Sequence, residues 1–343
     1  MTARRPIALD AMGGDGPPRV RVEAALEAVL EHRIPVTLVG PIRRLRREVS
    51  RLPSLPDGLQ LVDAEDVVAN DEAPVAVLRG KRNSSLSVAA RLVRDGQASA
   101  MVTAGNTGAA WVAAKSCLGM IEGVDRPALA AILPRMKGQT LVLDVGANVE
   151  CKPSQLMQFA VMGSFYAERV LGVSRPSVGL MSVGEEEGKG GPRAREQFRA
   201  LSGAGINFVG NVEGRDVFSG TVDVIVCDGF TGNVVLKVAE GLGEMVIGML
   251  MEEARKSPLY GAGLLIAKGA FRNLKKKVDY AEYGGAPLLG VAGPCLICHG
   301  RSNRKAIRNA LRFADSYASS DVLRQIGDKV HEVLATPAWR GND

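Results

Sequence analysis

The stretch VDVIVCDGFTGN (222–233), followed by VVLKVAEGLGEMVIGMLMEEARK (234–256), decides the fold class. Its first part is a short run rich in Val and Ile that reaches an Asp-Gly pair, and its second part is apolar at helical spacing. A strand that is apolar on both faces and leads into a helix is typical of a parallel sheet covered by helices. The stretch therefore predicts a strand-to-helix unit of an α/β protein.

The same unit recurs along the chain, with helical periodicity in intervals such as 20–32 and 156–171. Seven further apolar runs end on Gly, Asp or Asn, or within one residue of them: 7–10, 36–40, 59–64, 99–106, 140–148, 177–186 and 206–211. This alternation predicts a mostly parallel sheet with helices on both sides. We expect a single α/β domain over 1–335 and a flexible tail over 336–343.

The composition points to a folded globular protein. Of 343 residues, 46% are hydrophobic and 23% are charged. No apolar run approaches the roughly 20 residues that cross a bilayer, and the first residues lack the apolar stretch of a secretion signal. Five cysteines are an odd number in a chain without an export signal, so we expect reduced thiols and a cytoplasmic location.

The formal net charge of +6 is mild, and we expect no nucleic-acid partner. Cations nevertheless gather in two places, one early and one late in the chain. They are Arg43, Arg44, Arg46 and Arg47, and then Arg272, Lys275, Lys276 and Lys277. A solvated helix face is the simplest interpretation of each group.

The segment at about 240–280 predicts a helical arm. Apolar Leu259, Tyr260, Leu264 and Leu265 precede the late group of cations. An apolar stretch followed by cations suits a membrane interface or an acidic partner, and a dimer contact or a core helix is the alternative. Two helices should follow, the first capped by Ser302 or Asn303.

Several short motifs resemble known binding or catalytic motifs but do not match them fully. Cys295-Leu-Ile-Cys298-His299 has the spacing of c-type haem attachment, but it lies in a run of small apolar residues that predicts a buried strand, and no export signal precedes it. No second cysteine pair completes a zinc site. The loop Gly184–Gly190 resembles a P-loop but lacks its spacing, although Lys189 and its backbone amides suit an anion. Neither the dinucleotide motif GxGxxG after the first strand nor the hydrolase motif GxSxG is present. With no dinucleotide motif and no complete set of metal ligands, we expect no cofactor and no metal.

Polar residues follow four of the expected strands. Ligands of open α/β sheets bind beyond the carboxyl ends of the strands, so these loops predict a binding site. In any single loop, Gly, Asp and Asn are also explained by their ordinary role in turns. The residues are Asp10, Gly13, Gly14 and Asp15; Gly105, Asn106, Thr107 and Gly108; Asp144, Gly146 and Asn148; and Asp228, Gly229, Thr231, Gly232 and Asn233.

Read together, these loops resemble one family, the bacterial phosphate acyltransferases. The matching motifs are IALDAMGGD (7–15), TAGNTGA (103–109), LDVGANVECKPSQLMQFAVMG (143–163), SVGEEEGKG (182–190), FSGTVDVIVCDGFTGNVVLK (218–237), and DYAEYGGAPLLG with HGRSN (279–303). Gly191 stands where the family often has Asn, and Asn83 where some members have Asp, which affects loop details.

The resemblance implies a three-layer α/β/α fold akin to isocitrate dehydrogenases and phosphate acetyltransferases, in a homodimer. It implies transfer of a fatty acyl group from acyl-[acyl carrier protein] to inorganic phosphate, for phospholipid synthesis through a downstream glycerol-3-phosphate acyltransferase. It also implies peripheral association with the cytoplasmic membrane. Two other interpretations stay open: a phosphate acetyltransferase-like enzyme that uses acyl-CoA, and a non-catalytic membrane scaffold.

Attack of phosphate on a thioester requires a held anion, donors for the developing oxyanion and a leaving thiolate. We expect Lys189 and Lys152 to pair with phosphate, Asp228 to orient, and His299 to polarise the carbonyl or protonate the sulfur. The expected hydrogen-bonding positioners are Asn106, Thr107, Asn148 and Asn233. The other expected binding residues are Asp10, Gly13, Gly14, Thr231, Ser302 and Asn303, and Leu264, Leu265 and the late cations are expected to meet the membrane or a partner.

Overall fold

The computed structural model describes residues 4–52, 54–278 and 284–334, with backbone only for 274–278 and 334. Within them one sheet of 11 strands runs in the order β3-β2-β1-β4-β11-β10-β5-β6-β9-β7-β8. The strands are β1 (Ile7–Asp10), β2 (Val36–Gly40), β3 (Leu59–Asp63), β4 (Ala100–Thr103), β5 (Ala128–Pro134), β6 (Gln139–Leu143), β7 (Val178–Met181), β8 (Phe208–Val212), β9 (Val224–Val226), β10 (Ala286–Leu289) and β11 (Cys295–Ile297). The predicted tail 336–343 lies outside the described residues.

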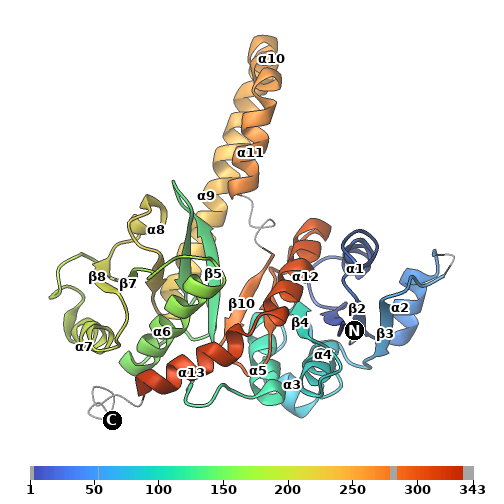
Figure 1. Ribbon diagram of the computed structural model, residues 1–343. Helices are drawn as coiled ribbons and strands as arrows, with labels where there is room; N and C mark the ends of the chain where they lie inside the picture. The colour runs from blue at the N-terminus through green and yellow to red at the C-terminus, as the bar shows by residue number, and fades with distance from the viewer. Residues whose placement is uncertain (1–3, 53, 279–283, 335–343) are drawn as a thin grey trace.

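Helices cover both faces of this sheet (Figure 1). They are α1 (Arg19–His32), α2 (Ile42–Val49), α3 (Ala76–Arg79), α4 (Ser85–Arg94), α5 (Thr107–Leu118), α6 (Pro153–Arg169), α7 (Gly191–Ser202), α8 (Asp216–Ser219), α9 (Gly229–Lys256), α10 (Pro258–Ile266), α11 (Lys268–Val278), α12 (Arg304–Ser319) and α13 (Val322–Leu334).

Alternation along the strands produces two cores. Ile7 and Leu9 of β1 join the core formed with α1, α6, α12 and α13, whereas Ala8 joins the core formed with α4 and α5. Successive side chains of a strand point to opposite faces, so each buried strand contributes to both layers. The predicted mostly parallel sheet in an α/β/α sandwich is confirmed, and so is the strand predicted around Cys295.

The two halves of the sheet point in opposite directions. β1, β4 and β11 are parallel to one another, and β6, β9 and β7 are parallel to one another. Between them, β11 pairs with β10, β10 with β5, and β5 with β6, all antiparallel. Three successive reversals place the carboxyl ends of the two halves at opposite edges. The polar loops predicted to meet at one edge therefore form two groups.

The sequence pattern did not predict the two strands that cause this reversal. β5 reads ALAAILP and β10 reads APLL, so both are rich in Ala, Leu and Pro rather than in β-branched residues. The run 222–233 was also only partly a strand. Its extended part ends at Val226, and the residues from Gly229 onward are the first turn of α9.

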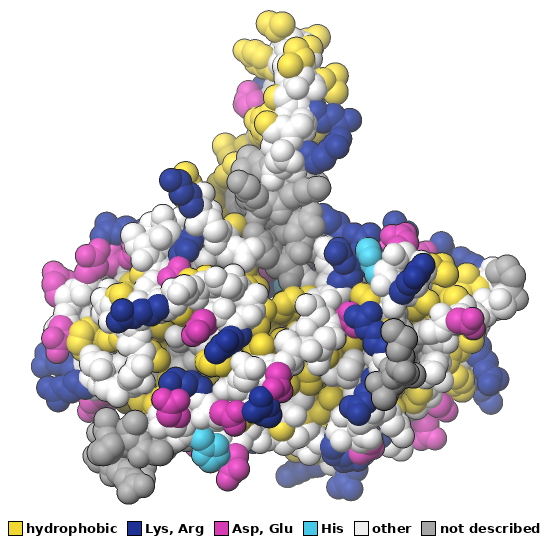
Figure 2. All heavy atoms as spheres, in the orientation of Figure 1, with side chains coloured by type: hydrophobic (Ala, Val, Ile, Leu, Met, Phe, Trp, Pro, Cys, Tyr) yellow, Lys and Arg dark blue, Asp and Glu magenta, His cyan; other side chains and the backbone are white. Residues whose placement is uncertain are grey.

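The helical arm stands clear of the body (Figure 1). It consists of α9, whose 28 residues span about 40 Å, and of α10 and α11, which return along it. At the tip Leu265 is 71% exposed and Ile266 is 89% exposed, while Leu264 is half-buried. Figure 2 shows this tip as a cap of hydrophobic side chains. No helix in the described ranges is long and apolar enough to cross a membrane.

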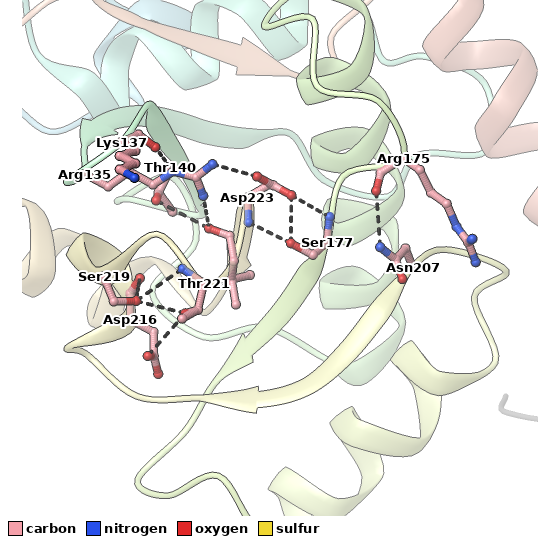
Figure 3. Close-up of polar contacts among 11 residues, drawn as sticks. Arg135, Lys137, Thr140, Arg175, Ser177, Asn207, Asp216, Ser219, Thr221 and Asp223 are labelled. Atoms are coloured by element: carbon pink, nitrogen blue, oxygen red, sulfur yellow. Dashed lines mark hydrogen bonds and ion pairs between the residues drawn. The ribbon is translucent and has the colours of Figure 1, made fainter.

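A cavity of about 550 Å³ lies beside the β5–β6 hairpin, next to Leu171 and Val173. Arg135 of that hairpin pairs with Asp223 at 2.8 Å, and Ser177 donates to the same carboxylate (Figure 3). Although burial opposes the effect, the hydrogen bonds from Ser177 and the ion pair with Arg135 hold the pKa of Asp223 below its ordinary value. This network ties the hairpin to the amino ends of β7 and β9 and contains none of the predicted site residues.

Candidate active site

The first group of strand-end residues surrounds Asp10, which is buried at the end of β1. Its Oδ1 accepts from the backbone N–H groups of Met12 and Gly13, each at 3.1 Å, and its Oδ2 accepts from the Thr103 hydroxyl at 2.8 Å. A Cβ on Gly13 would lie 2.6 Å from the backbone nitrogen of Gly105. Glycine is therefore required where the loops after β1 and β4 touch.

Asn106 and Asn303 act as helix caps in this first group. The Asn106 Oδ1 accepts from Ala109 N–H at 2.9 Å at the start of α5, and its amide donates to the carbonyls of Asn70 and Glu72. The side chain of Asn106 is thus engaged within the protein, and the half-buried Thr107 follows it as the first residue of α5. Of the two predicted caps, Ser302 and Asn303, it is Asn303 that caps α12, by accepting from Ala306 N–H at 3.0 Å.

His299 lies in the same group, because Asp15 N–H donates to the neighbouring Gly300 carbonyl at 2.8 Å, close to Gly14. Its Nδ1 accepts from Arg301 N–H at 3.1 Å, so the neutral ring carries its proton on Nε2. That Nε2 lies 3.9 Å from Glu240 of α9. Burial and then the charge of Lys237 lower the pKa of His299, against the opposing effect of Glu240. Ser302 is buried beside this loop.

The second group surrounds Asp144, which is fully buried at the end of β6. Its carboxylate accepts from the N–H groups of Leu129, Gly146 and Ala147 at 3.0–3.2 Å. It also accepts from the backbone and the side-chain amide of Asn148, at 2.6 and 2.9 Å. Burial raises the pKa of Asp144, and these hydrogen bonds oppose it. The Oδ1 of Asn148 is buried and accepts no hydrogen bond from any residue that the structure describes.

Helix α9 begins inside this second group. Asp228 caps it by accepting from Thr231 N–H at 2.8 Å, and Gly229 N–H donates to the Asn148 carbonyl at 2.7 Å. A Cβ on Gly232 would lie 1.9 Å from the Asp144 carbonyl oxygen, so only glycine permits this approach. The exposed Asn233 faces Gly146.

Two more helices begin at the same place. Lys152, which is exposed, is the residue before α6, and its N–H donates to Gln155. Arg193 in the first turn of α7 donates to the Cys151 carbonyl at 2.9 Å. This contact holds the start of α7, and with it the preceding loop that carries Lys189, beside residues 148–152. The amino ends of α6, α7 and α9 therefore meet around one short segment.

Arg193 and Asn211 were missed by the sequence reasoning. The Asn211 amide donates to the Glu186 carbonyl at 2.9 Å and so anchors the loop of Lys189 from β8. No motif marks either residue. The one signal that could have found Arg193 is its place in the sequence, four residues after Lys189.

Helix α9 passes from the second group to the first. Asn233 lies in the second group, and Glu240, seven residues later, faces His299 of the first. At 1.5 Å per residue the two positions are about 10 Å apart along the helix. Hence Lys189, Lys152, Asn148, Thr231 and Asn233 belong to one side, and Asp10, Gly13, Gly14, Asn106 and His299 to the other.

Four of the five cysteines, Cys151, Cys227, Cys295 and Cys298, are buried, and Cys117 is half-buried. Burial, then the nearby Asp144, raise the pKa of the Cys151 thiol to about 12. Burial likewise raises the pKa of Cys295 and Cys298 to about 12. Thiols with such pKa values are poor nucleophiles and poor metal ligands at neutral pH. Among the described residues no group of three or more His, Cys, Asp or Glu is placed to hold a metal ion. A reaction without metal stays a prediction.

The fold is that of phosphotransacetylases. A phosphotransacetylase from Streptococcus pyogenes superposes with a TM-score of 0.63, at 16% identity, over 93% of this chain and 95% of that one. A branched-chain phosphotransacylase from Enterococcus faecalis gives 0.53, at 13% identity, over 90% and 98%. These similarities define the class of fold, an α/β sandwich shared with acyl-transfer enzymes.

Residues 6–325 match the model of the family described as fatty acid synthesis protein. The phosphate acyltransferase of Pelotomaculum thermopropionicum is 50% identical over 328 residues, which cover 95% of each chain. That of Geobacter sulfurreducens is 49% identical over 324 residues, or 94% of each. The chain belongs to this family of phosphate acyltransferases, and it is a transferase.

Proposed function

We propose that this protein transfers a fatty acyl group from acyl-[acyl carrier protein] to inorganic phosphate. The observation that carries the proposal is the meeting of three helix amino ends, those of α6, α7 and α9, beside Lys152 and the loop of Lys189. Helix amino ends carry partial positive charge and free N–H groups, which favour phosphate. Two flanking lysines add the charge that a dianion needs.

In the proposed reaction a phosphate oxygen attacks the thioester carbonyl carbon. A C–O bond forms, the C–S bond breaks, and the carrier leaves as a thiolate. A thiol has an ordinary pKa of about 8.5, so its thiolate leaves without much help from an acid. Lys189 and Lys152 hold the phosphate, Asn233 positions it from α9, and Asp228 fixes the first turn of that helix. Positioning of this kind supplies roughly 7–11 kcal/mol in favourable systems.

His299 is proposed to act on the thioester from the other group. Its Nε2–H lies toward α9 and can donate to the thioester carbonyl as negative charge develops there. In this proposal the acyl thioester lies along α9 between the two groups, with its carbonyl carbon toward the phosphate.

Competition between two thioesters tests the donor. With acyl-[acyl carrier protein] and acyl-CoA at equal concentration, we expect acyl phosphate to form mainly from the carrier protein. A preference for acyl-CoA would favour the phosphate acetyltransferase-like alternative. No turnover with either would favour the membrane scaffold.

The pH dependence of kcat/KM tests the role of His299. Because its pKa is lowered below 6.5, the neutral donor form prevails at neutral pH. We expect kcat/KM to be flat above pH 7 and to fall only as the pH drops below 6.5. In His299→Ala, kcat should fall by about 10- to 100-fold, and the acid limb should disappear. An acid limb that persists unchanged in the variant would assign it to another group.

We also propose that the arm brings the enzyme to the cytoplasmic face of the membrane, where the acyl phosphate passes to glycerol-3-phosphate acyltransferase for phosphatidic acid synthesis. The exposed tip supports this, as does the exposed cation Arg272 beside it, whereas the side chains of Lys275, Lys276 and Lys277 lie outside the described residues. Apolar Leu242 and Met245 are exposed on α9 and suit a homodimer.

Replacing Leu264 and Leu265 by Glu should release the protein from anionic vesicles and leave turnover in solution largely unchanged, because two charges oppose insertion of the tip. Replacing the three lysines Lys275, Lys276 and Lys277 by Glu should weaken binding to anionic vesicles. The difference from the unmodified protein should shrink as the salt concentration rises, because salt screens this attraction. Vesicle sedimentation measures both, and Val209→Glu, on an exposed residue of the body, is the control. A leucine variant that stays on vesicles but becomes monomeric would assign the tip to the dimer.

A further inference from the structure

Helix α2 presents four arginines to solvent on one side of the body. Arg43, Arg44, Arg46 and Arg47 are all exposed, and Leu45 and Val49 form the buried side of the helix. Within the described part of the chain, none of the four lies within ion-pair distance of a carboxylate. Arginines on other surface helices do have acidic partners, as in the pairs of Arg19 with Glu23, Arg304 with Glu27 and Arg324 with Asp328.

This arrangement is unfavourable for the helix itself. Arg43 lies three and four residues before Arg46 and Arg47, and residues at this spacing are neighbours on a helix surface, so their like charges repel. The first turn contains no acidic residue that would offset them. A solvated helix face without function needs no such concentration of one charge. A polyanionic partner would relieve the repulsion.

The helix begins next to the first group of strand-end residues. A Cβ on Gly40, at the end of β2, would lie 2.9 Å from the side chain of Met12, which follows Asp10 in the loop after β1. Ile42 N–H then donates to Asp63 at 2.9 Å, which fixes the start of α2 at the same sheet edge. A partner seated on α2 is therefore beside the loop that faces the proposed thioester position.

Figure 2 shows Lys and Arg side chains gathered at the right-hand end of the body, where Figure 1 places α2. The apolar tip of the arm is remote from this surface. A membrane that receives the tip is thus not in position to cover α2, which favours a soluble partner.

We infer that the α2 arginine face (Arg43, Arg44, Arg46 and Arg47) is the docking surface for the acidic acyl carrier protein. The inference rests on the proposed function, because it concerns the donor of that reaction. Exposed charges of this kind raise the rate of encounter and fix orientation more than they add to chemistry. The α2 arginine face should therefore affect the KM for the carrier-bound substrate and not the KM for a small thioester.

The test compares Arg43→Gln/Arg47→Gln with a matched control, Arg94→Gln/Arg324→Gln, whose arginines are also exposed but are paired with acidic neighbours. We expect the α2 variant to raise KM for acyl-[acyl carrier protein] about fivefold. Its KM for phosphate and its turnover of acyl-pantetheine, a small thioester, should not change. The dependence of kcat/KM on salt should also become weaker than in the control.

Calorimetric titration with holo-[acyl carrier protein] measures the same docking without turnover, and the α2 variant should bind more weakly than the control. Equal affinity and equal KM in the two variants would overturn the inference. Loss of binding to anionic vesicles with unchanged KM would overturn it in favour of a lipid surface. If the unmodified enzyme binds the carrier protein through α2 but forms no acyl phosphate, the proposed function fails while the docking surface stands.

Discussion

Lys189→Ala is expected to lower kcat/KM for phosphate by about 100- to 1,000-fold, the range found when one preorganised donor is removed from an anionic transition state. The loop of Lys189 is exposed, and Asn211 and Arg193 hold it through their own side chains rather than through that of Lys189. The melting temperature should therefore barely change. Steady-state kinetics at limiting phosphate, with thermal unfolding of the same preparation, measure both.

Lys137→Ala is the matched control, since Lys137 is an exposed lysine in the β5–β6 hairpin, at the opposite edge of the sheet from the second group. It should retain full turnover. A folded Lys189→Ala protein with normal turnover at limiting phosphate would remove Lys189 from the site.

Asp144→Ala is expected to lower the free energy of unfolding by about 3–5 kcal/mol. The change leaves four backbone N–H groups, of which those of Leu129 and Asn148 are buried, and the Asn148 side-chain amide without their shared acceptor. Because these groups shape the loop on which α9 begins, activity should be lost as well. Denaturant unfolding followed by circular dichroism measures the stability.

Asp228→Ala is the control for this loss of stability, because it also removes a carboxylate at the end of a strand. Asp228 is only half-buried and accepts from one N–H group, that of Thr231. Removing such a cap costs about 1 kcal/mol. Equal losses of stability in the two variants would contradict the account of Asp144 as the acceptor that organises the second group.

The sequence was informative where local physics decides the structure. The run at 7–10, the helix at 20–32 and the cap at Asn303 depend on apolar periodicity and on turn chemistry, and each is found at its predicted place. The arm was predictable for the same reason. Its apolar residues recur at helical spacing over a stretch longer than the globular body of the protein can bury.

The division of the site was not predictable, because it depends on long-range pairing. β5 and β10 are 158 residues apart at their starts (286 minus 128), and no local signal tells that they pair or that they reverse the sheet. As a result the loops of Asp10 and Asp144, which look alike in sequence, end at opposite edges. Arg193 and Asn211 escaped notice because they act through backbone carbonyls of distant loops. The catalytic roles proposed for Lys189, Lys152, Asn233 and His299 stay predictions.

The most direct test of the central claim is the formation of acyl phosphate by the purified enzyme from acyl-[acyl carrier protein] and radiolabelled inorganic phosphate. The account predicts that labelled acyl phosphate and the free thiol of the carrier protein appear in equal amounts, and only when phosphate is present. Release of the thiol without phosphate, or no incorporation of label from the carrier-bound acyl group, would contradict it.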